Sequence, residues 1–334
     1  MNKTSDINAR TEMYAVKSFL EVFQPMMVTQ RFAHTENQPK GNSRVRKWRR
    51  YLPLPVTKAP VAEGITPESY RIKYQDIQVN LQQFGGIVET TDVIMDVVDD
   101  PIMKITSRLL AEQAANVIEG LTIDVLKSGT NVIYANGVGR SAVNTVITKE
   151  MLRRCVRTLD RNGARTISSI IGATPNISTA GVEAAFYALG HTDLESDLRN
   201  LANFKTTVEY GNPGSAMEGE IGAHERIRFI LTQNFTPWTK VGGAATTIVL
   251  SDGGLAAAGI DACDVYPLII LGRDAYGAVR LQGKGTFEMY VLNPGVARGG
   301  DPIGQRGTAG WKTWYAAKIL TENYLVRLEV AASV

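Results

Sequence analysis

The sequence predicts an α+β fold, because its extended segments and its long helix lie in different parts of the chain. Three observations support this prediction. Alternating apolar and polar residues fill much of the chain before residue 95, a single long helical pattern follows, and short strands alternate with short helices from residue 164 onward. Neither an all-helical nor an all-β fold accommodates all three patterns.

The first 95 residues predict little hydrophobic core of their own. Residues 9–24 have apolar side chains at helical spacing, and Pro39, Pro53, Pro55 and Pro60 then exclude a central strand in the stretch that follows. Residues 45–95 alternate in a way that predicts a long, two-sided β projection. A two-stranded projection is only marginally stable in water, so we expect it to pack on another surface.

The strongest helical pattern begins after Asp99 and Asp100, with Pro101 at the first helical position. It ends at Lys127 and Gly129, residue types that favour a helix C-terminus. About 28 residues at ~1.5 Å each predict a rod of roughly 40 Å. Its apolar positions predict the buried stripe: Ile102, Ile105, Leu109, Ala114, Val117, Leu121 and Val125.

The rest of the chain predicts a mixed α/β module and a closing hairpin. A second helix is expected over Thr148–Asn162, and a buried strand over Tyr266–Leu271. We expect Trp311–Leu320 and Tyr324–Val330 to pair as a hairpin around Thr321–Asn323.

Composition excludes several classes of protein. The 334 residues are 44% hydrophobic and 21% charged, which excludes a wholly disordered chain. No segment has the ~20 apolar residues of a membrane-spanning helix, and the polar N-terminus lacks the apolar core of a secretory signal. Cys155 and Cys263 are far apart, which excludes a disulfide scaffold. We therefore expect a soluble protein that is made inside the cell and has no membrane partner.

The small net charge of +3 hides an asymmetry along the chain. Residues 1–60 contain eleven Lys and Arg against four Asp and Glu, a net +7, so the remainder is −4. The run RVRKWRRY at residues 44–51 interleaves five basic residues with Val45, Trp48 and Tyr51. Such a run could bind nucleic acid, clamp the acidic surface of another copy, or be a solvated charged segment.

No constellation of catalytic or metal-binding residues is present in the sequence. Gly137, Gly139 and Ala142 match a dinucleotide-binding spacing, but the β-branched residues that follow are a poor helix start, so we interpret the match as a turn. The histidines fall in three separate segments. We therefore expect no enzymatic activity, no cofactor and no metal.

The order of these parts, and four blocks of sequence, resemble the major capsid protein of tailed double-stranded-DNA bacteriophages. The resemblance is closest to the podovirus subfamily whose virions package a large RNA polymerase. The blocks are QFGGIVETTD at 83–92, LAEQAA at 110–115 with DVLKSGTN at 124–131, DVYPLIILGRDAYG at 264–277, and DPIGQRGTAGWKTWYAAK at 301–318.

The resemblance implies the major capsid fold of tailed phages and herpesviruses, with five parts in this chain. These are an N-arm (1–44), an E-loop with flanking P-domain strands (45–95), a P-domain with the spine helix (96–163), an A-domain (164–300) and a C-terminal P-domain β-hairpin (301–334). It also implies that copies of the chain assemble into pentamers and hexamers, which form an icosahedral head around the DNA genome.

The resemblance further implies partners and a location. These are a separate scaffolding protein, a portal, decoration proteins, and packaged double-stranded DNA held non-specifically on the inner face. The protein would lie in the virion capsid, and in the host bacterial cytoplasm during assembly. Two alternatives stay open: a cellular encapsulin-like nanocompartment shell of the same fold, and a nucleic-acid-binding protein.

We expect the basic run to form part of the interface between subunits, because a complementary charge pattern sets the register of association. The expected basic and aromatic residues are Arg44, Arg46, Lys47, Trp48, Arg49, Arg50 and Tyr51, with the two aromatic side chains as apolar anchors. The expected acids on the adjacent subunit are Glu63, Glu68, Glu89, Asp99 and Asp100.

Overall fold

The structure is a computed structural model, and it describes residues 27–333 with gaps. The gaps are 40, 42, 57, 59, 61, 62, 65, 67, 68, 98–101, 169–181, 211–215, 246–248, 252–254, 258–260, 282–287, 296 and 298. The helix expected over residues 9–24 lies outside the described residues.

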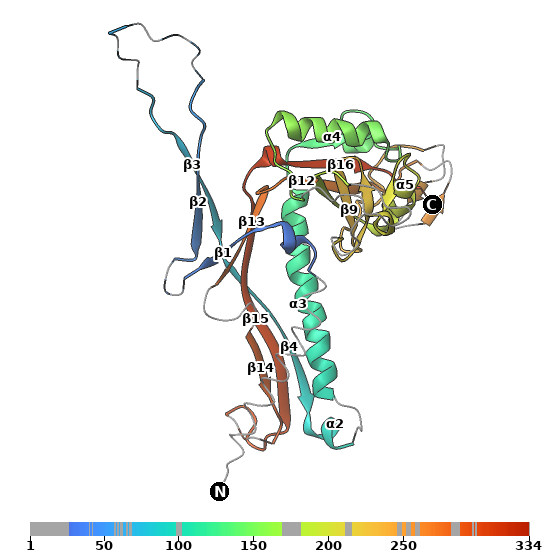
Figure 1. Ribbon diagram of the computed structural model, residues 1–334. Coiled ribbons are helices and arrows are strands. Elements are labelled where there is room, and N and C mark those ends of the chain that lie inside the picture. Colours follow the sequence, from blue (N-terminus) through green and yellow to red (C-terminus); the bar gives the residue numbers. More distant parts are fainter. Residues whose placement is uncertain are drawn as a thin grey trace.

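The described residues form two large sheets, one long helix, a two-stranded extension and several smaller elements (Figure 1). The five-stranded sheet contains β1 (His34–Gln38), β4 (Gln82–Thr91), β13 (Tyr276–Leu281), β14 (Glu288–Leu292) and β15 (Arg306–Ile319). β15 pairs along one edge with β4 and along its other edge with β14 and then β13, and β1 pairs parallel to β13.

The seven-stranded sheet has the order β5-β16-β12-β6-β9-β8-β7. Its strands are β5 (Val132–Tyr134), β6 (Phe186–Gly190), β7 (Lys205–Thr206), β8 (Glu220–His224), β9 (Ile227–Leu231), β12 (Tyr266–Leu271) and β16 (Leu325–Val330). Two smaller pairs complete the strands: β2 (Val45–Tyr51) with β3 (Tyr74–Asn80), and β10 (Val249–Ser251) with β11 (Leu255–Ala257).

The helices are α2 (Asp92–Val97), α3 (Ile102–Lys127), α4 (Lys149–Arg161) and α5 (Glu195–Arg199). Short 3-10 turns occur at Thr29–Phe32, Arg140–Ala142, Thr192–Leu194, Thr207–Glu209 and Glu322–Tyr324. The expected end of the long helix at Lys127 is confirmed, as is Thr148 as the cap of α4, whose side chain accepts a hydrogen bond from the Met151 N–H.

The long helix α3 packs against both sheets, and its buried stripe differs from the expected one. The residues that face the five-stranded sheet are Leu110, Ala111, Ala114, Ala115 and Ile118, while Ile123 and Leu126 pack beneath the seven-stranded sheet. Ile105, Leu109 and Val117, which were expected inside, are exposed. The alanines let the strands approach closely, so Trp311 and Tyr315 of β15 fill the space that larger helical residues would need.

The expected C-terminal hairpin is wrong, because β15 and β16 belong to different sheets. All six residues of β16 are buried, so this strand needs a neighbour on each side, and it lies between β5 and β12. The parts expected at 164–300 and 301–334 stay a prediction, and each of them contributes strands to both sheets. β13 and β14 lie in the five-stranded sheet, while β16 lies in the seven-stranded sheet.

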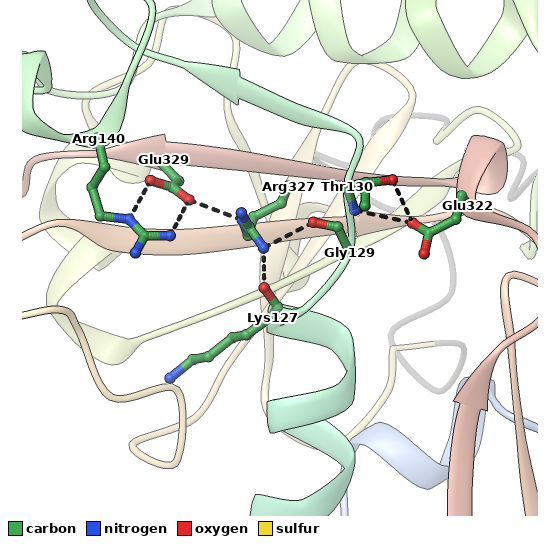
Figure 2. A network of polar contacts seen from close by, with 7 residues as sticks. All are labelled: Lys127, Gly129, Thr130, Arg140, Glu322, Arg327 and Glu329. Carbon is green, nitrogen blue, oxygen red and sulfur yellow. Dashed lines mark hydrogen bonds and ion pairs between the residues drawn. The ribbon is translucent and has the colours of Figure 1, made fainter. Parts of the chain in front are cut away.

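A buried polar network joins α3 to the seven-stranded sheet (Figure 2). Glu329, which is fully buried, accepts hydrogen bonds of 2.8 Å from Nε and Nη2 of Arg140 and one of 2.9 Å from Nε of Arg327. Arg327 also donates from Nη1 to the carbonyl oxygens of Lys127 and Gly129, the latter at 3.0 Å. A cation at these carbonyls stabilises the negative end of the helix dipole.

The described part of the arm, residues 27–38, packs on its own chain. The Thr29 N–H and hydroxyl donate hydrogen bonds of 2.9 and 2.7 Å to the buried Glu119 carboxylate of α3. Tyr276 donates from its hydroxyl to the Thr29 carbonyl, and the Phe32 ring packs against Tyr187 with 4.6 Å between centroids. This stretch of the arm therefore finds its partners within one subunit.

The Arg327→Met substitution should lower the free energy of unfolding by about 3 kcal/mol, because it leaves one buried carboxylate less compensated and removes a donor to the carbonyls of Lys127 and Gly129. Urea unfolding followed by circular dichroism measures the change. Arg199→Met, which breaks the exposed Arg199–Glu195 pair on α5, is the control and should cost less than about 0.5 kcal/mol. Equal effects of the two substitutions would contradict a structural role for the buried network.

Ionisation of Glu119 should make the folded protein less stable as the pH rises. Burial raises the pKa of this carboxyl above its usual value, and the hydrogen bonds from Thr29 lower it only in part. The folded chain therefore holds this proton more tightly than the unfolded chain, so its contribution to stability falls as pH rises above about 4.5. Urea unfolding at pH 5 and pH 8 should show a smaller pH-dependent loss for Glu119→Gln than for the parent protein. The same loss in both proteins would contradict this assignment.

Candidate subunit interface

The β2–β3 extension leaves the body as a two-stranded ribbon of seven residue pairs, from Val45 opposite Asn80 to Tyr51 opposite Tyr74 (Figure 1). Beyond Tyr51 and Tyr74, the described residues between 52 and 73 form no strand. The extension expected from the alternating pattern is therefore present but shorter than the expected 45–95, because β4 pairs with β15 and belongs to the five-stranded sheet. The outer end of the extension projects away from both sheets (Figure 1).

Trp48 anchors the root of the extension to its own chain. Its side chain is 9% exposed and packs against Leu81, Val279 and Ala316. Gly277 leaves room for the indole ring, because a Cβ atom there would lie 2.9 Å from Cζ2 of Trp48. Trp48 therefore fixes the direction of the ribbon, which corrects its expected role as an anchor on an adjacent subunit.

Four of the five arginine and lysine side chains in the basic run have contacts within the chain. Arg46 donates from Nε to Glu36 of β1 at 2.8 Å, and Arg49 binds both oxygens of Asp76 on β3, at 2.8 and 3.0 Å. The hydrogen bond from Arg49 lowers the pKa of the Asp76 carboxyl. For Arg46 and Arg49, the acids that the structure places in contact are thus in the same chain.

The remaining charged residues of the run, and Tyr51, have exposed side chains and no carboxylate partner in the described part of the chain. Arg50 donates to Oγ1 of Thr321 at 3.0 Å and to Oε1 of Gln75 at 2.7 Å, and Arg44 lies over the Trp314 ring. Lys47 is exposed, and Tyr51 is 64% exposed at the outer end of β2.

The expected acids do not lie beside the basic run of the same chain where they are described. Glu89 is exposed on β4, opposite Thr308 and eight residues beyond Leu81 at the root of the extension, so strand geometry places it about 26 Å from that root. Glu63 is exposed near the outer end of the extension. Glu68, Asp99 and Asp100 lie outside the described residues.

The tip of the extension carries exposed apolar side chains that the charge analysis missed. Val56 and Ile72 are 86% and 70% exposed, and three further large side chains share this environment: Leu52, Leu54 and Tyr70. Five such residues gathered at one end of a projection exceed the scattered exposure of an ordinary surface. The prolines between them, Pro53 and Pro55, could have indicated this apolar and extended segment.

A groove of about 530 Å³ lies on the five-stranded sheet. Its floor includes Gly85 and Gly310, and its walls include Ile87, Tyr290 and Leu292. These three wall residues belong to β4 and β14, which flank β15, and all three are exposed. Side chains at the glycines would fill the floor, and at Gly310 a Cβ atom would come within 3.0 Å of the Gly86 carbonyl oxygen.

The positions of the titratable groups bear on metal binding and on thiol reactivity. Within the ranges given above, no group of three or more His, Cys, Asp or Glu is placed to hold a metal ion. Burial raises the pKa of the Cys155 thiol to about 12, which suppresses the reactive thiolate. No helix among these residues is long and apolar enough to cross a membrane.

An exposed apolar tip and an apolar groove elsewhere on the same chain are typical of a subunit that associates head-to-tail with copies of itself. Such a subunit binds its neighbours through two different surfaces, one on each partner.

Comparison with known proteins agrees with this class. Residues 74–327 match the phage capsid protein family, so the chain belongs to that family. It is 23% identical over 299 residues to the major capsid protein of Pseudomonas phage KPP21, a match that covers 83% of this chain and 73% of the relative. The protein is accordingly a structural major capsid protein that forms the phage head and assembles into capsomers in the virion capsid.

Solved structures show the same fold at low identity. The capsid of Ralstonia phage GP4 superposes with a TM-score of 0.61 at 9% identity, over 91% of this chain and 88% of that one. The SrpI encapsulin complex from Synechococcus elongatus gives a TM-score of 0.53 at 10% identity, over 92% and 88%. The expected fold class is thereby confirmed. The fold is shared by phage heads and encapsulins, whereas the sequence family is that of phage capsids.

The Trp48→Ala substitution should destabilise the protein by about 3 kcal/mol, because it leaves a cavity at the root of the extension. Tyr51→Ala, three residues further along the same strand and exposed, is the matched control and should change the free energy of unfolding by less than about 0.5 kcal/mol. Urea unfolding of the two variants tests the difference. A Trp48→Ala protein as stable as the parent would contradict the anchoring role.

Proposed function

We propose that the extension of one subunit lies across the five-stranded sheet of a neighbouring subunit, and that this head-to-tail contact builds pentamers and hexamers. The observation that carries the proposal is the exposure of the apolar tip, above all of Val56 and Ile72. Exposed apolar surface of this extent is unfavourable in water, and burying it releases about 25 cal/mol per Å².

The groove between Ile87 and Tyr290 is the surface that we propose for the tip. The extension leaves one side of the body, and the lower ends of β4 and β14 lie at the opposite side (Figure 1). A subunit therefore offers its tip and its groove to two different neighbours. Repeating such a contact closes a ring when the rotation between subunits is a whole fraction of a turn.

Charged residues contribute to the register of this contact in our proposal. Lys47, Arg50 and Tyr51 lie on the exposed part of the ribbon, and Arg44 lies at its root. We propose that they meet acids on the adjacent subunit, from the set Glu63, Glu68, Glu89, Asp99 and Asp100. Arg46 and Arg49 contribute indirectly, since their ion pairs with Glu36 and Asp76 stiffen the ribbon.

The finer features of the assembly are also proposals. The chain would belong to the podovirus subfamily whose virions package a large RNA polymerase. It would build an icosahedral lattice with a separate scaffolding protein, a portal and decoration proteins. Assembly would take place in the host bacterial cytoplasm, and the inner face would contact double-stranded DNA non-specifically. The resemblance of the sequence blocks at 264–277 and 301–318 supports the subfamily. These blocks contain β12, the first two residues of β13 and nearly all of β15.

Making the apolar tip more polar should reduce assembly by at least half without unfolding the subunit. In the Val56→Ser, Ile72→Ser double variant, two of the most exposed apolar side chains become polar, and neither is part of a described core cluster. We expect the thermal midpoint of the unassembled subunit to change by less than about 2 °C. Sedimentation and negative-stain microscopy of the expressed chain should show a loss of shells and capsomers by at least half.

The control is Val208→Ser, which alters an equally exposed valine on the 3-10 turn Thr207–Glu209, next to the seven-stranded sheet. This variant should assemble as the parent does. Normal assembly of the double variant would refute the proposed docking of the tip, while a parent chain that remains a monomer at high concentration would refute the shell itself.

A further inference from the structure

The 3-10 turn Thr29–Phe32 lies beside α3 near the seven-stranded sheet, where it is the short blue coil in Figure 1. Its first residue binds the long helix, and its last two residues bind β6 and the segment before β8. The turn therefore links α3 to the seven-stranded sheet by a path that is separate from the end of the helix. We call Thr29–Phe32 the strap.

The attachment of the strap to α3 is polar and buried. The N–H and the hydroxyl of Thr29 bind the two oxygens of the Glu119 carboxylate, at 2.9 and 2.7 Å. The Thr29 carbonyl accepts a hydrogen bond from Tyr276, the first residue of β13. All three residues are fully buried, so water does not compete for these bonds and the strap is held at one position on the helix.

The attachment of the strap to the seven-stranded sheet consists of a ring contact and an ion pair. The buried ring of Phe32 packs against Tyr187 of β6, with 4.6 Å between centroids. Arg31 donates from Nη2 to the Glu218 carboxylate at 3.0 Å, two residues before β8 begins. The Glu218 side chain is exposed, so the ion pair contributes little and the ring contact supplies most of this attachment.

Apart from the strap, the links between the two large sheets gather at one place. Among the described helices and strands, the chain passes between the two parts at three short connections: 128–131, 272–275 and 320–324. The second and third are joined by a hydrogen bond of 2.8 Å from the Gly272 N–H to the Tyr324 carbonyl. The Thr130 N–H of the first donates to Glu322 of the third at 3.1 Å. Connections gathered in this way form a pivot, about which a tilt of one sheet is the easiest motion.

The strap acts at a distance from this pivot. Ile123 and Leu126 pack beneath the seven-stranded sheet, and Arg327 of β16 binds the carbonyl oxygen of Lys127, so the contact of α3 with this sheet lies at the end of the helix. Glu119 precedes Lys127 by eight residues, which is about 12 Å along the helix axis. A link attached this far from the pivot opposes a tilt that the contacts at the helix end resist only weakly.

We propose that the strap holds the seven-stranded sheet at one tilt relative to α3, and that this tilt sets the curvature at which copies of the chain close into a shell. The first part concerns the single subunit, while the second part rests on the proposed function. Every copy carries the same strap, so a small change of tilt repeats in each subunit and adds up around a closed assembly. The diameter at which the assembly closes then changes.

The test removes the attachment to the seven-stranded sheet and keeps the attachment to α3. The strap variant is Arg31→Gln, Phe32→Ala, which loses the ion pair with Glu218 and the ring contact. Leu159→Ala is the matched control, because it also removes a buried apolar side chain but lies on α4, outside the strap and its contacts. If the double variant does not fold, Phe32→Leu takes its place, since it keeps apolar bulk and loses the ring contact.

Spin labels report the tilt in dissociated, full-length subunits. They are attached at Asn116→Cys on α3 and at Arg199→Cys on α5, both of which are exposed positions. The native Cys155 and Cys263 are buried, so labelling is selective. Pulsed electron paramagnetic resonance gives the distribution of distances between the labels. This distribution should be narrow in the parent and in Leu159→Ala, and about twofold wider in the strap variant.

Negative-stain microscopy of assembled shells reports the curvature. Shells of the parent and of Leu159→Ala should share one diameter. Shells of the strap variant should have diameters that spread over a range about twofold wider, because each subunit then samples several tilts.

An unchanged distance distribution in the strap variant would overturn the strap, as would equal broadening in Leu159→Ala, which would indicate a general loosening of the fold. A wider distance distribution with unchanged shell diameters would overturn the control of curvature. The absence of shells from the parent chain is a different result, since it refutes the proposed function. The label distances in the subunit would still decide whether the strap holds the tilt.

Discussion

The contact between α3 and β15 is the interaction on which the rest of the structure depends. Ala111, Ala114 and Ala115 bring the helix close to the strand, and Trp311 and Tyr315 fill the interface from the other side. Because β15 pairs with three other strands, its position on the helix sets the position of β4, β13 and β14. The helix then continues beneath the seven-stranded sheet, where Arg327 binds its terminal carbonyl groups. One rod thus fixes both sheets relative to each other.

The five-stranded sheet, held in place by α3, also sets the direction in which the extension projects. β3 and β4 are separated only by the buried Leu81, so the ribbon and the five-stranded sheet are nearly continuous. Trp48 packs against Val279 of β13 and Ala316 of β15, which fixes the second strand of the ribbon to the same sheet. A projection that is marginal by itself is therefore held at its root, and only its outer part needs a partner from another chain.

The sequence predicts individual helices and strands better than it predicts which of them pair or pack together. The end of α3 at Lys127, the cap of α4 at Thr148 and the strand at Tyr266–Leu271 all follow from short-range chemistry, and all three are confirmed. The buried stripe of α3 was misjudged because Leu109 and Val117 are apolar yet exposed, while alanines are buried for their small size. The hairpin was wrong because pairing depends on which strands lie on either side of β16, and local spacing does not determine that. At the interface, charge alone pointed to Arg46 and Arg49, although their carboxylate partners are in the same chain.

The pairing of Tyr51 with Tyr74 closes the folded part of the extension, so the two chain ends of the segment 52–73 are held side by side on adjacent strands. Adding or removing residues between these two tyrosines costs only a small change in loop-closure entropy, and the described side chains of this segment are all exposed. The reach of the subunit is therefore a property that can vary independently of its stability. A lineage could lengthen or shorten this segment to suit a differently curved lattice while keeping the same rod and the same two sheets.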